Sequence, residues 1–163
     1  MESMGTRPRR VDQARQRQKS KIFMTMAHEI SRLATCERLR VGCVITDGRG
    51  FILSTGYNGA PAGTPHCSHD GCILDPKTGQ CVRAIHAELN AVITAANQGV
   101  SLKESIAYVT TRPCTRCLQA LIQVGVTKIY YDKEYASENT DLFNYFVNTS
   151  GIDVVQFYEG NSA

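Results

Sequence analysis

The sequence contains no apolar run that approaches the roughly 20 residues of a membrane-spanning helix, so no membrane partner is expected. Its first residues also lack the apolar stretch of a secretory signal. These two absences predict a cytoplasmic, reducing environment. We therefore interpret the seven cysteines as metal ligands or core residues rather than as a disulfide framework.

An excess of charge is also missing from most of the chain. The 163 residues carry a net charge of +3, but residues 1–21 alone hold seven basic and two acidic side chains. The remainder has 11 basic and 13 acidic residues, a balance that argues against a dedicated nucleic-acid surface. The basic segment is typical of a solvated tail or a first helix, and a nucleic-acid-binding arm is the alternative.

Length and hydrophobic patterning predict a single α/β domain after the basic segment. We divide the chain into a flexible basic tail or helix start at 1–19 and one domain at 20–163. Apolar periodicity predicts helices at 20–35 (with Ser20 as N-cap), 86–98, 114–124 and 138–149. Strands are predicted at 41–46, 51–55, 106–110, 127–131 and 153–157. A hairpin followed by alternating helices and strands indicates a mixed five-stranded sheet with helices packed on it.

Two short motifs carry the chemistry that the sequence predicts. The motif H-A-E at 86–88 opens one predicted helix, and P-C-T-R-C at 113–117 opens the next. A catalytic zinc takes three protein ligands and leaves a fourth position for water, and one imidazole with two thiolates is such a set. Cysteines three residues apart share one face of a helical turn, where the helix dipole lowers thiol pKa values. We therefore assign His86, Cys114 and Cys117 as ligands of a catalytic zinc.

Glu88 lies two residues after the histidine ligand and is assigned the proton transfers. We expect it to take a proton from the zinc-activated water and to deliver protons to a nucleobase ring nitrogen and to the departing ammonia. The alternative is a structural zinc site. Such a site closes with a fourth cysteine or histidine, and the sequence has none beside these three ligands.

The other cysteines predict a second metal site. Cys43 falls inside a predicted buried strand and is interpreted as a small core residue. The insert at 60–84 has no clear period, and a loop of that length needs a reason to stay ordered. Four thiolates form a closed structural zinc site, which would fasten this insert to the end of the first helix. The candidates are Cys36, Cys67, Cys72 and Cys81.

The chain resembles the deoxycytidylate (dCMP) deaminases of phage and bacterial type, within the zinc-dependent cytidine deaminase superfamily. The similarity runs from about residue 27 to residue 157. It rests on V-G-C-V-I at 41–45, G-Y-N-G-A-P at 56–61, H-A-E-L-N-A at 86–91, Y-V-T at 108–110 and P-C-T-R-C at 113–117. The G-Y-N-G loop and the cysteine-rich insert are the parts specific to dCMP deaminases. The resemblance implies a three-layer cytidine-deaminase fold with helices on both faces of the sheet.

This resemblance also implies a reaction and its control. The reaction is hydrolysis of dCMP to dUMP and ammonia, which supplies dUMP for thymidylate synthesis. Many members are hexamers that dCTP with Mg²⁺ activates and dTTP inhibits. The regulatory nucleotide is then expected near Tyr57, Asn58 and Gly59.

Substrate and structural-zinc contacts follow from the same resemblance. Asn58, Ala87 and Tyr135 are assigned to substrate binding. For the second zinc, related phage enzymes have ligands that match Cys36 and Cys67, whereas the remaining ligands vary. His66 and His69 are therefore rivals of Cys72 and Cys81.

A nucleotide 5′-phosphate requires cationic or N–H donors. Arg38, Arg40 and Arg112 fall near predicted loop ends close to the site, and we assign Arg38 and Arg112 to substrate binding. The alternative is that each is a solvated surface arginine.

Two other functions compete with dCMP deamination. One is a tRNA adenosine deaminase or a free-base deaminase, which the insert and the G-Y-N-G loop disfavour. The other is a zinc-stabilised nucleic-acid-binding module that uses the basic segment and has no turnover. The intact zinc and glutamate motifs disfavour the latter.

Overall fold

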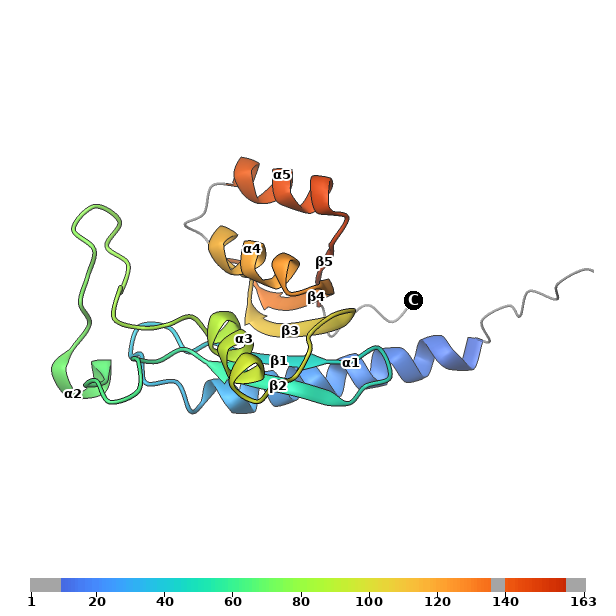
Figure 1. The fold of residues 1–163 in the computed structure, drawn as a ribbon, viewed down its shortest axis with the longest axis horizontal. Helices are drawn as coiled ribbons and strands as arrows, with labels where there is room; N and C mark the ends of the chain where they lie inside the picture. The colour runs from blue at the N-terminus through green and yellow to red at the C-terminus, as the bar shows by residue number, and fades with distance from the viewer. Residues whose placement is uncertain (1–9, 136–139, 158–163) are drawn as a thin grey trace, which may run out of the picture.

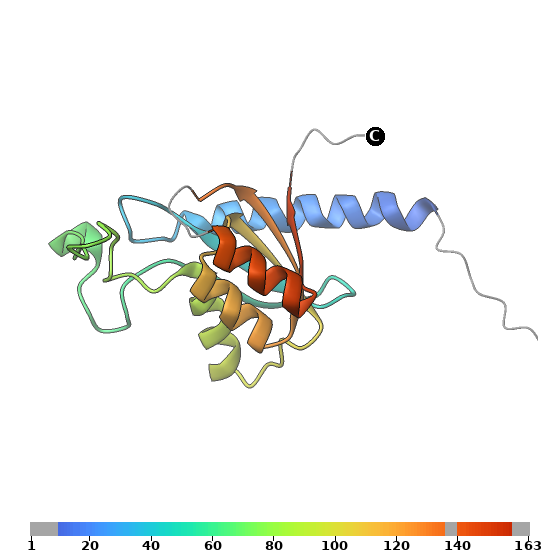
Figure 2. The same cartoon turned by 90° about the horizontal axis from the view of Figure 1, so that it is seen from above.

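The computed structural model describes residues 10–135 and 140–157, which form one sheet with helices on both faces (Figures 1 and 2). The strands are β1 (Gly42–Thr46), β2 (Ile52–Tyr57), β3 (Ser105–Thr111), β4 (Val126–Lys133) and β5 (Asp153–Gln156). The helices are α1 (Arg10–Ser31), α2 (Cys67–Asp70), α3 (Ala87–Asn97), α4 (Thr115–Gln123) and α5 (Thr140–Ser150). The predicted α/β class and the mixed five-stranded sheet are thus confirmed.

The strand order is β2-β1-β3-β4-β5. β1 runs antiparallel to both β2 and β3, whereas β3, β4 and β5 run parallel to one another. The register brings the start of β1, the end of β2 and the ends of β3 and β4 to one edge, since Gly42 pairs with Tyr57 and Thr111 pairs with Lys133. The loops that leave this edge therefore meet, as ligand-binding loops do in α/β folds.

Side chains alternate along the strands and fill two cores. On one face, the alanines of α3 and the leucines of α4 pack with Cys43, Ile45 and Ala107. On the other face, α1 contributes Phe23 and Met24 to a second cluster. Cys43 is fully buried in this arrangement, which confirms its predicted place in the core.

Two glycines allow the helices to approach the sheet closely. A Cβ atom on Gly42 would lie 2.0 Å from the carbonyl oxygen of Ala27 in α1. A Cβ atom on Gly56 would lie 2.2 Å from the carbonyl oxygen of Ala87 in α3. The position of the first turn of α3, which carries the H-A-E motif, therefore depends on the absence of a side chain in β2.

The predicted N-cap at Ser20 is wrong, because α1 already begins at Arg10. Residues 10–19 contain no glycine or proline and are rich in Arg, Gln and Lys, so helix propensity continues the helix beyond its buried part. Ser20 is a buried helix-interior residue whose Oγ lies 3.4 Å from the hydroxyl of Tyr108. Residues 1–9 of the predicted tail, and 138–139 of the predicted last helix, lie outside the described residues.

The insert at 60–84 extends beyond the sheet, on the side away from the first residues of α1 (Figures 1 and 2). It contains α2, which hydrophobic periodicity did not predict, and an isolated bridge between Leu74 and Cys81. No helix in the described part of the chain has the length and apolar character needed to cross a membrane.

Candidate active site

Two helix N-termini bring the H-A-E and P-C-T-R-C motifs together. His86 is the N-cap of α3 and Cys114 is the N-cap of α4, and these helices pack side by side (Figure 1). The backbone N–H of Cys117 donates a hydrogen bond to the Cys114 sulfur at 3.5 Å. Residues 111–113 turn the chain from the end of β3 into α4, so both caps lie at the sheet edge where the loops meet.

The three predicted zinc ligands converge with a geometry that fits the metal. Their donor atoms all lie within 4.8 Å of one another. His86 Nδ1 is 3.5 Å from Cys114 Sγ and 3.4 Å from Cys117 Sγ. In a tetrahedral zinc site, bonds of about 2.1 and 2.3 Å place nitrogen and sulfur about 3.6 Å apart. The side chains are thus already arranged as three vertices of a zinc tetrahedron.

The two thiols of this site differ in acidity. Hydrogen bonding from Cys117 lowers the pKa of Cys114 to about 4, and His86 contributes in the same direction. The same hydrogen bond, together with burial, raises the pKa of Cys117. A thiolate is therefore available at Cys114 to begin metal binding, and the metal charge would then favour deprotonation of Cys117.

Glu88 lies in the first turn of α3 and is only 4% exposed. Burial raises the pKa of its carboxyl to about 7, although its own backbone N–H and the nearby His86 favour the charged form. A group that accepts and releases protons near neutral pH suits general acid–base catalysis. A zinc ion beside it would lower this pKa, because a cation favours the carboxylate.

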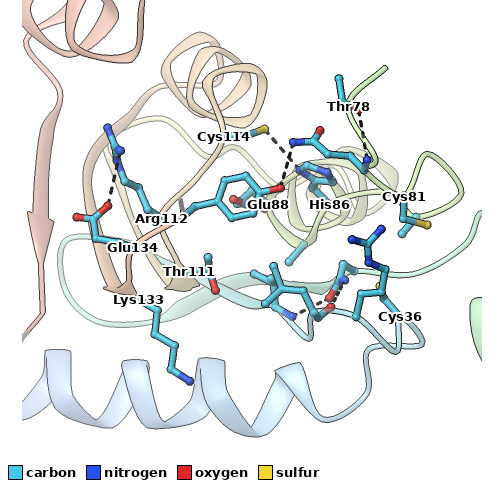
Figure 3. Close-up of a pocket in the computed structure, with 18 of the residues that line it drawn as sticks. Cys36, Thr78, Cys81, His86, Glu88, Thr111, Arg112, Cys114, Lys133 and Glu134 are labelled. Atoms are coloured by element: carbon cyan, nitrogen blue, oxygen red, sulfur yellow. Dashed lines mark hydrogen bonds and ion pairs between the residues drawn. The ribbon is translucent and has the colours of Figure 1, made fainter. Parts of the chain in front are cut away.

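A cavity of about 520 Å³ opens over these residues (Figure 3). His86, Ala87, Glu88 and Cys114 line it, together with residues from the loops at the same sheet edge. Three of the lining residues carry positive charge, namely Arg38, Arg112 and Lys133. The acidic residues in the lining are Glu88 and Glu134, so the cavity combines a buried carboxyl with a mostly cationic surround.

Asn58 lines the cavity, but both the oxygen and the nitrogen of its side-chain amide are hydrogen-bonded to backbone atoms. Its Oδ1 accepts from the N–H of Val41 at 2.7 Å, and its Nδ2 donates to the carbonyl of Leu39 at 2.7 Å. Asn58 thus fixes the segment that enters β1. Its predicted neighbours Tyr57 and Gly59 are not among the residues that line this cavity.

The predicted phosphate contacts also line the cavity, and each has a partner within the protein. Arg38 Nη1 donates to the carbonyl of Gly79 at 2.6 Å. Arg112 stacks on Phe143, with its guanidinium carbon 3.9 Å from the ring centroid, and pairs with Glu134 at 3.6 Å. Arg40, in contrast, is exposed and does not line the cavity.

The remaining cysteines form a second cluster. The sulfurs of Cys36, Cys67 and Cys72 lie within 4.8 Å of one another. Cys81 Sγ is 3.7 Å from Cys67 Sγ and also hydrogen-bonds with Cys72. Two zinc–sulfur bonds of about 2.3 Å in a tetrahedron separate the sulfurs by about 3.8 Å, close to the 3.7 Å between Cys67 and Cys81. Cys36, Cys67 and Cys72 are thus grouped closely enough to hold a metal ion, and Cys81 lies beside them.

The histidine rivals for this second site lie beside it. The rings of His66 and His69 pack edge to face, with centroids 5.7 Å apart. Among the described residues, neither imidazole joins the cysteine sulfurs that group within 4.8 Å. Cys81 is not in that group either, although its sulfur contacts Cys67, so the identity of a fourth ligand stays a prediction.

The sequence interpretation missed part of the cavity wall. Thr78, Gly79 and Gln80, from the insert, line the cavity, as does Lys133 from the end of β4. Their proximity depends on a long loop that folds back over the sheet edge. The sequence signal that could have indicated this was Cys81, because a predicted member of the second cysteine cluster would bring its neighbours towards the end of α1.

Comparison with known proteins shows which family this sequence matches. The sequence model described as the cytidine and deoxycytidylate deaminase zinc-binding region matches residues 17–133. The Bacillus subtilis ComE operon protein 2 is 37% identical over 116 residues, which cover 71% of this chain and 60% of that protein. The deoxycytidylate deaminase of Enterobacteria phage T4 is 31% identical over 172 aligned positions, covering 83% of this chain and 88% of the phage protein.

A solved structure extends the similarity to the fold. The dCMP deaminase of cyanophage S-TIM5, determined in complex with dCMP and dUMP, is 28% identical and superposes with a TM-score of 0.69. The match covers 84% of this chain and 95% of that chain. The chain spans only part of some relatives. The match covers 60% of the Bacillus protein and 36% of the Schizosaccharomyces pombe deoxycytidylate deaminase.

Proposed function

Because the chain belongs to the zinc-binding family of cytidine and deoxycytidylate deaminases, we propose that it hydrolyses dCMP to dUMP and ammonia. The observation that carries this proposal is that the three zinc-ligand side chains group together beside a cavity whose lining includes the buried carboxyl of Glu88. A structural zinc site has no need of such a carboxyl or of an open cavity. The zinc motif alone indicates deamination, and the relatives with similar sequences indicate dCMP.

His86, Cys114 and Cys117 would hold the zinc ion. When bound, the ion supplies a water molecule acidic enough to act as a nucleophile near neutral pH. Glu88 accepts a proton from the attacking water and donates it to N3 of the cytosine ring. It then carries the second proton to the amino group, which leaves C4 as ammonia. The carboxyl can alternate between these roles because burial, which raises its pKa, opposes the effect of the zinc ion, which lowers it.

The distribution of charge orients the nucleotide. The base must reach the buried Glu88, so the sugar and phosphate extend towards the outer lining of the cavity. Arg38, Arg112 and Lys133 supply positive charge there, which matches a 5′-phosphate. Arg112 is the better ordered of the two predicted arginines, because Phe143 and Glu134 fix its guanidinium.

The second cluster is proposed as a structural zinc site formed by Cys36, Cys67, Cys72 and Cys81. Its support is the convergence of four thiols that belong to separate segments. The metal would tie the insert to the end of α1 and thereby compensate for the lack of a hydrophobic core in residues 60–84. The catalytic and structural ions would give two zinc ions per chain.

Control of the enzyme is proposed from the resemblance alone. We propose activation by dCTP with Mg²⁺, inhibition by dTTP, a hexameric assembly and a cytoplasmic location. The segment Tyr57–Gly59 is the proposed regulatory contact, and it lies at the end of β2 next to the cavity.

The test is a comparison of substrates with purified zinc-containing protein. We expect ultraviolet absorbance to report rapid loss of dCMP, faster than loss of deoxycytidine, dCTP or adenosine in tRNA. Addition of dCTP with Mg²⁺ should accelerate the reaction and dTTP should slow it. Turnover of tRNA or of a free base, with dCMP inert, would contradict the proposed substrate.

A further inference from the structure

The tip of the cysteine-rich insert is held as a rigid turn at the cavity. Asp75 Oδ1 accepts the backbone N–H groups of Lys77 and Thr78, each at 2.8 Å. The N–H of Asp75 in turn donates to the carbonyl of Gln80 at 2.8 Å. The turn is therefore closed on itself by hydrogen bonds, and residues 78–80 have a defined position despite their exposure.

Two further attachments fix this turn to the body of the protein. Arg38 donates to the carbonyl of Gly79 at 2.6 Å. Cys81, the next residue after Gln80, belongs to the second cysteine cluster through its contact with Cys67. The side chain of Gln80 is thus presented from a backbone that is anchored on both sides.

Gln80 contacts Tyr135, which lines the same cavity. Its Nε2 donates a hydrogen bond to the hydroxyl oxygen of Tyr135 at 3.3 Å. Tyr135 follows β4, whereas Gln80 comes from the insert, and both line the cavity that also contains Glu88 and His86. The hydrogen bond therefore joins the insert to the segment after β4 within the lining of one cavity.

The direction of this hydrogen bond has a chemical consequence. Because the Tyr135 oxygen accepts the bond from Gln80, the tyrosine O–H remains a donor for another group. The cations Arg38, Arg112 and Lys133 line the same cavity as Tyr135. An anionic acceptor attracted by these charges would find the tyrosine O–H beside it.

We propose that Gln80 is a positioning residue, which orients the Tyr135 hydroxyl to donate a hydrogen bond to the 5′-phosphate of the bound nucleotide. This inference rests on the proposed dCMP deaminase function. The insert would then have a role in substrate recognition, because the cysteine cluster fixes the position of Gln80, and Gln80 orients Tyr135. The role concerns binding rather than proton transfer, since Glu88 performs the chemistry.

The first test is a pair of substitutions, Gln80→Ala and Tyr135→Phe, assayed with dCMP and with deoxycytidine. Loss of one hydrogen bond corresponds to a rise in KM for dCMP of about 3- to 10-fold, with kcat within about twofold of the wild type. The KM for deoxycytidine, which has no phosphate, should be unchanged. Gln18→Ala, at an exposed position of α1, is the matched control and should alter neither value.

The second test is the double variant. If Gln80 acts through Tyr135, the double variant should be no worse than the more severe single variant. Gln80→Glu should raise KM for dCMP more than Gln80→Ala, because it places a carboxylate beside the phosphate. Melting temperature and zinc content, measured for each variant, separate these effects from misfolding.

The outcomes distinguish this inference from the proposed function. Wild-type turnover with an unchanged KM for dCMP in Gln80→Ala would overturn the role of Gln80 alone. An equal rise in KM for deoxycytidine, or additive effects in the double variant, would do the same. A wild-type protein that neither binds nor deaminates dCMP would overturn both.

Discussion

Substitution of Gly56 by alanine tests whether the β2–α3 contact places the catalytic residues. The new Cβ atom would lie 2.2 Å from the carbonyl oxygen of Ala87 and 2.4 Å from the backbone nitrogen of Ala91. Ordinary contact begins near 3.4 Å, so α3 must move by the difference of about 1.2 Å from the 2.2 Å approach. Both obstacles are backbone atoms, and no side-chain rotation can relieve them.

The displacement should lower both stability and activity. Overpacking of this kind costs about 1–3 kcal/mol of unfolding free energy, which urea denaturation measures. Because His86 and Glu88 lie at the start of the displaced helix, a shift of about 1 Å should lower kcat/KM about 100-fold. Gly48→Ala is the control, since a Cβ atom there meets no described atom within 4 Å. A Gly56→Ala protein with wild-type stability and wild-type kcat/KM would refute the reasoning.

Three other substitutions test separate parts of the account. Glu88→Gln should retain two zinc ions per chain, as measured by metal analysis. It should lower kcat by about 10²- to 10⁴-fold, because the amide cannot transfer protons. Turnover near the wild-type rate would exclude the proposed proton transfers. Cys72→Ser should reduce the zinc content from two ions to one and lower the melting temperature, and an unchanged metal content would remove the second site. Asp47→Ala should destabilise the β1–β2 turn, whose three N–H groups at residues 49–51 donate to Asp47. The bond from Phe51 is the largest contribution to a lowered pKa of Asp47, and the backbone and side chain of Arg49 act in the same direction. The stabilisation is therefore complete above the unfolded pKa of about 3.9 and is lost as the pH falls through the lower folded value. Denaturation at pH 6 and at pH 3 should show a larger difference between wild type and Asp47→Ala at pH 6, and a larger difference at pH 3 would contradict the assignment.

The local signals of the sequence were sufficient for the first set of ligands. Cys114 and Cys117 are three positions apart after a proline, and that pattern indicates both the start of a helix and the common face of two thiols. His86 occupies the corresponding position at the start of α3. The alternation of helices and strands predicted that the two helix starts lie close together. In the structure, the donor atoms of His86, Cys114 and Cys117 lie within 4.8 Å of one another.

Other features depend on contacts that no local pattern reports. Ser20 was taken for an N-cap because serine favours that position, but its hydroxyl is buried beside Tyr108 in the middle of α1. Asn58 was expected to contact substrate, and the structure adds a structural role, because its amide binds the backbone that leads into β1. Gln80 gave no signal in the sequence, since its place at the cavity depends on the fold of the whole insert.

The central claim is tested most directly by incubating dCMP with the zinc-containing protein in H₂¹⁸O and measuring the mass of the product. Hydrolytic attack at C4 predicts dUMP that carries one ¹⁸O atom, with one ammonia released for each dUMP formed. Glu88→Gln should yield almost no labelled dUMP under the same conditions. Absence of dUMP formation by the wild-type protein, or dUMP without the label, would contradict the account.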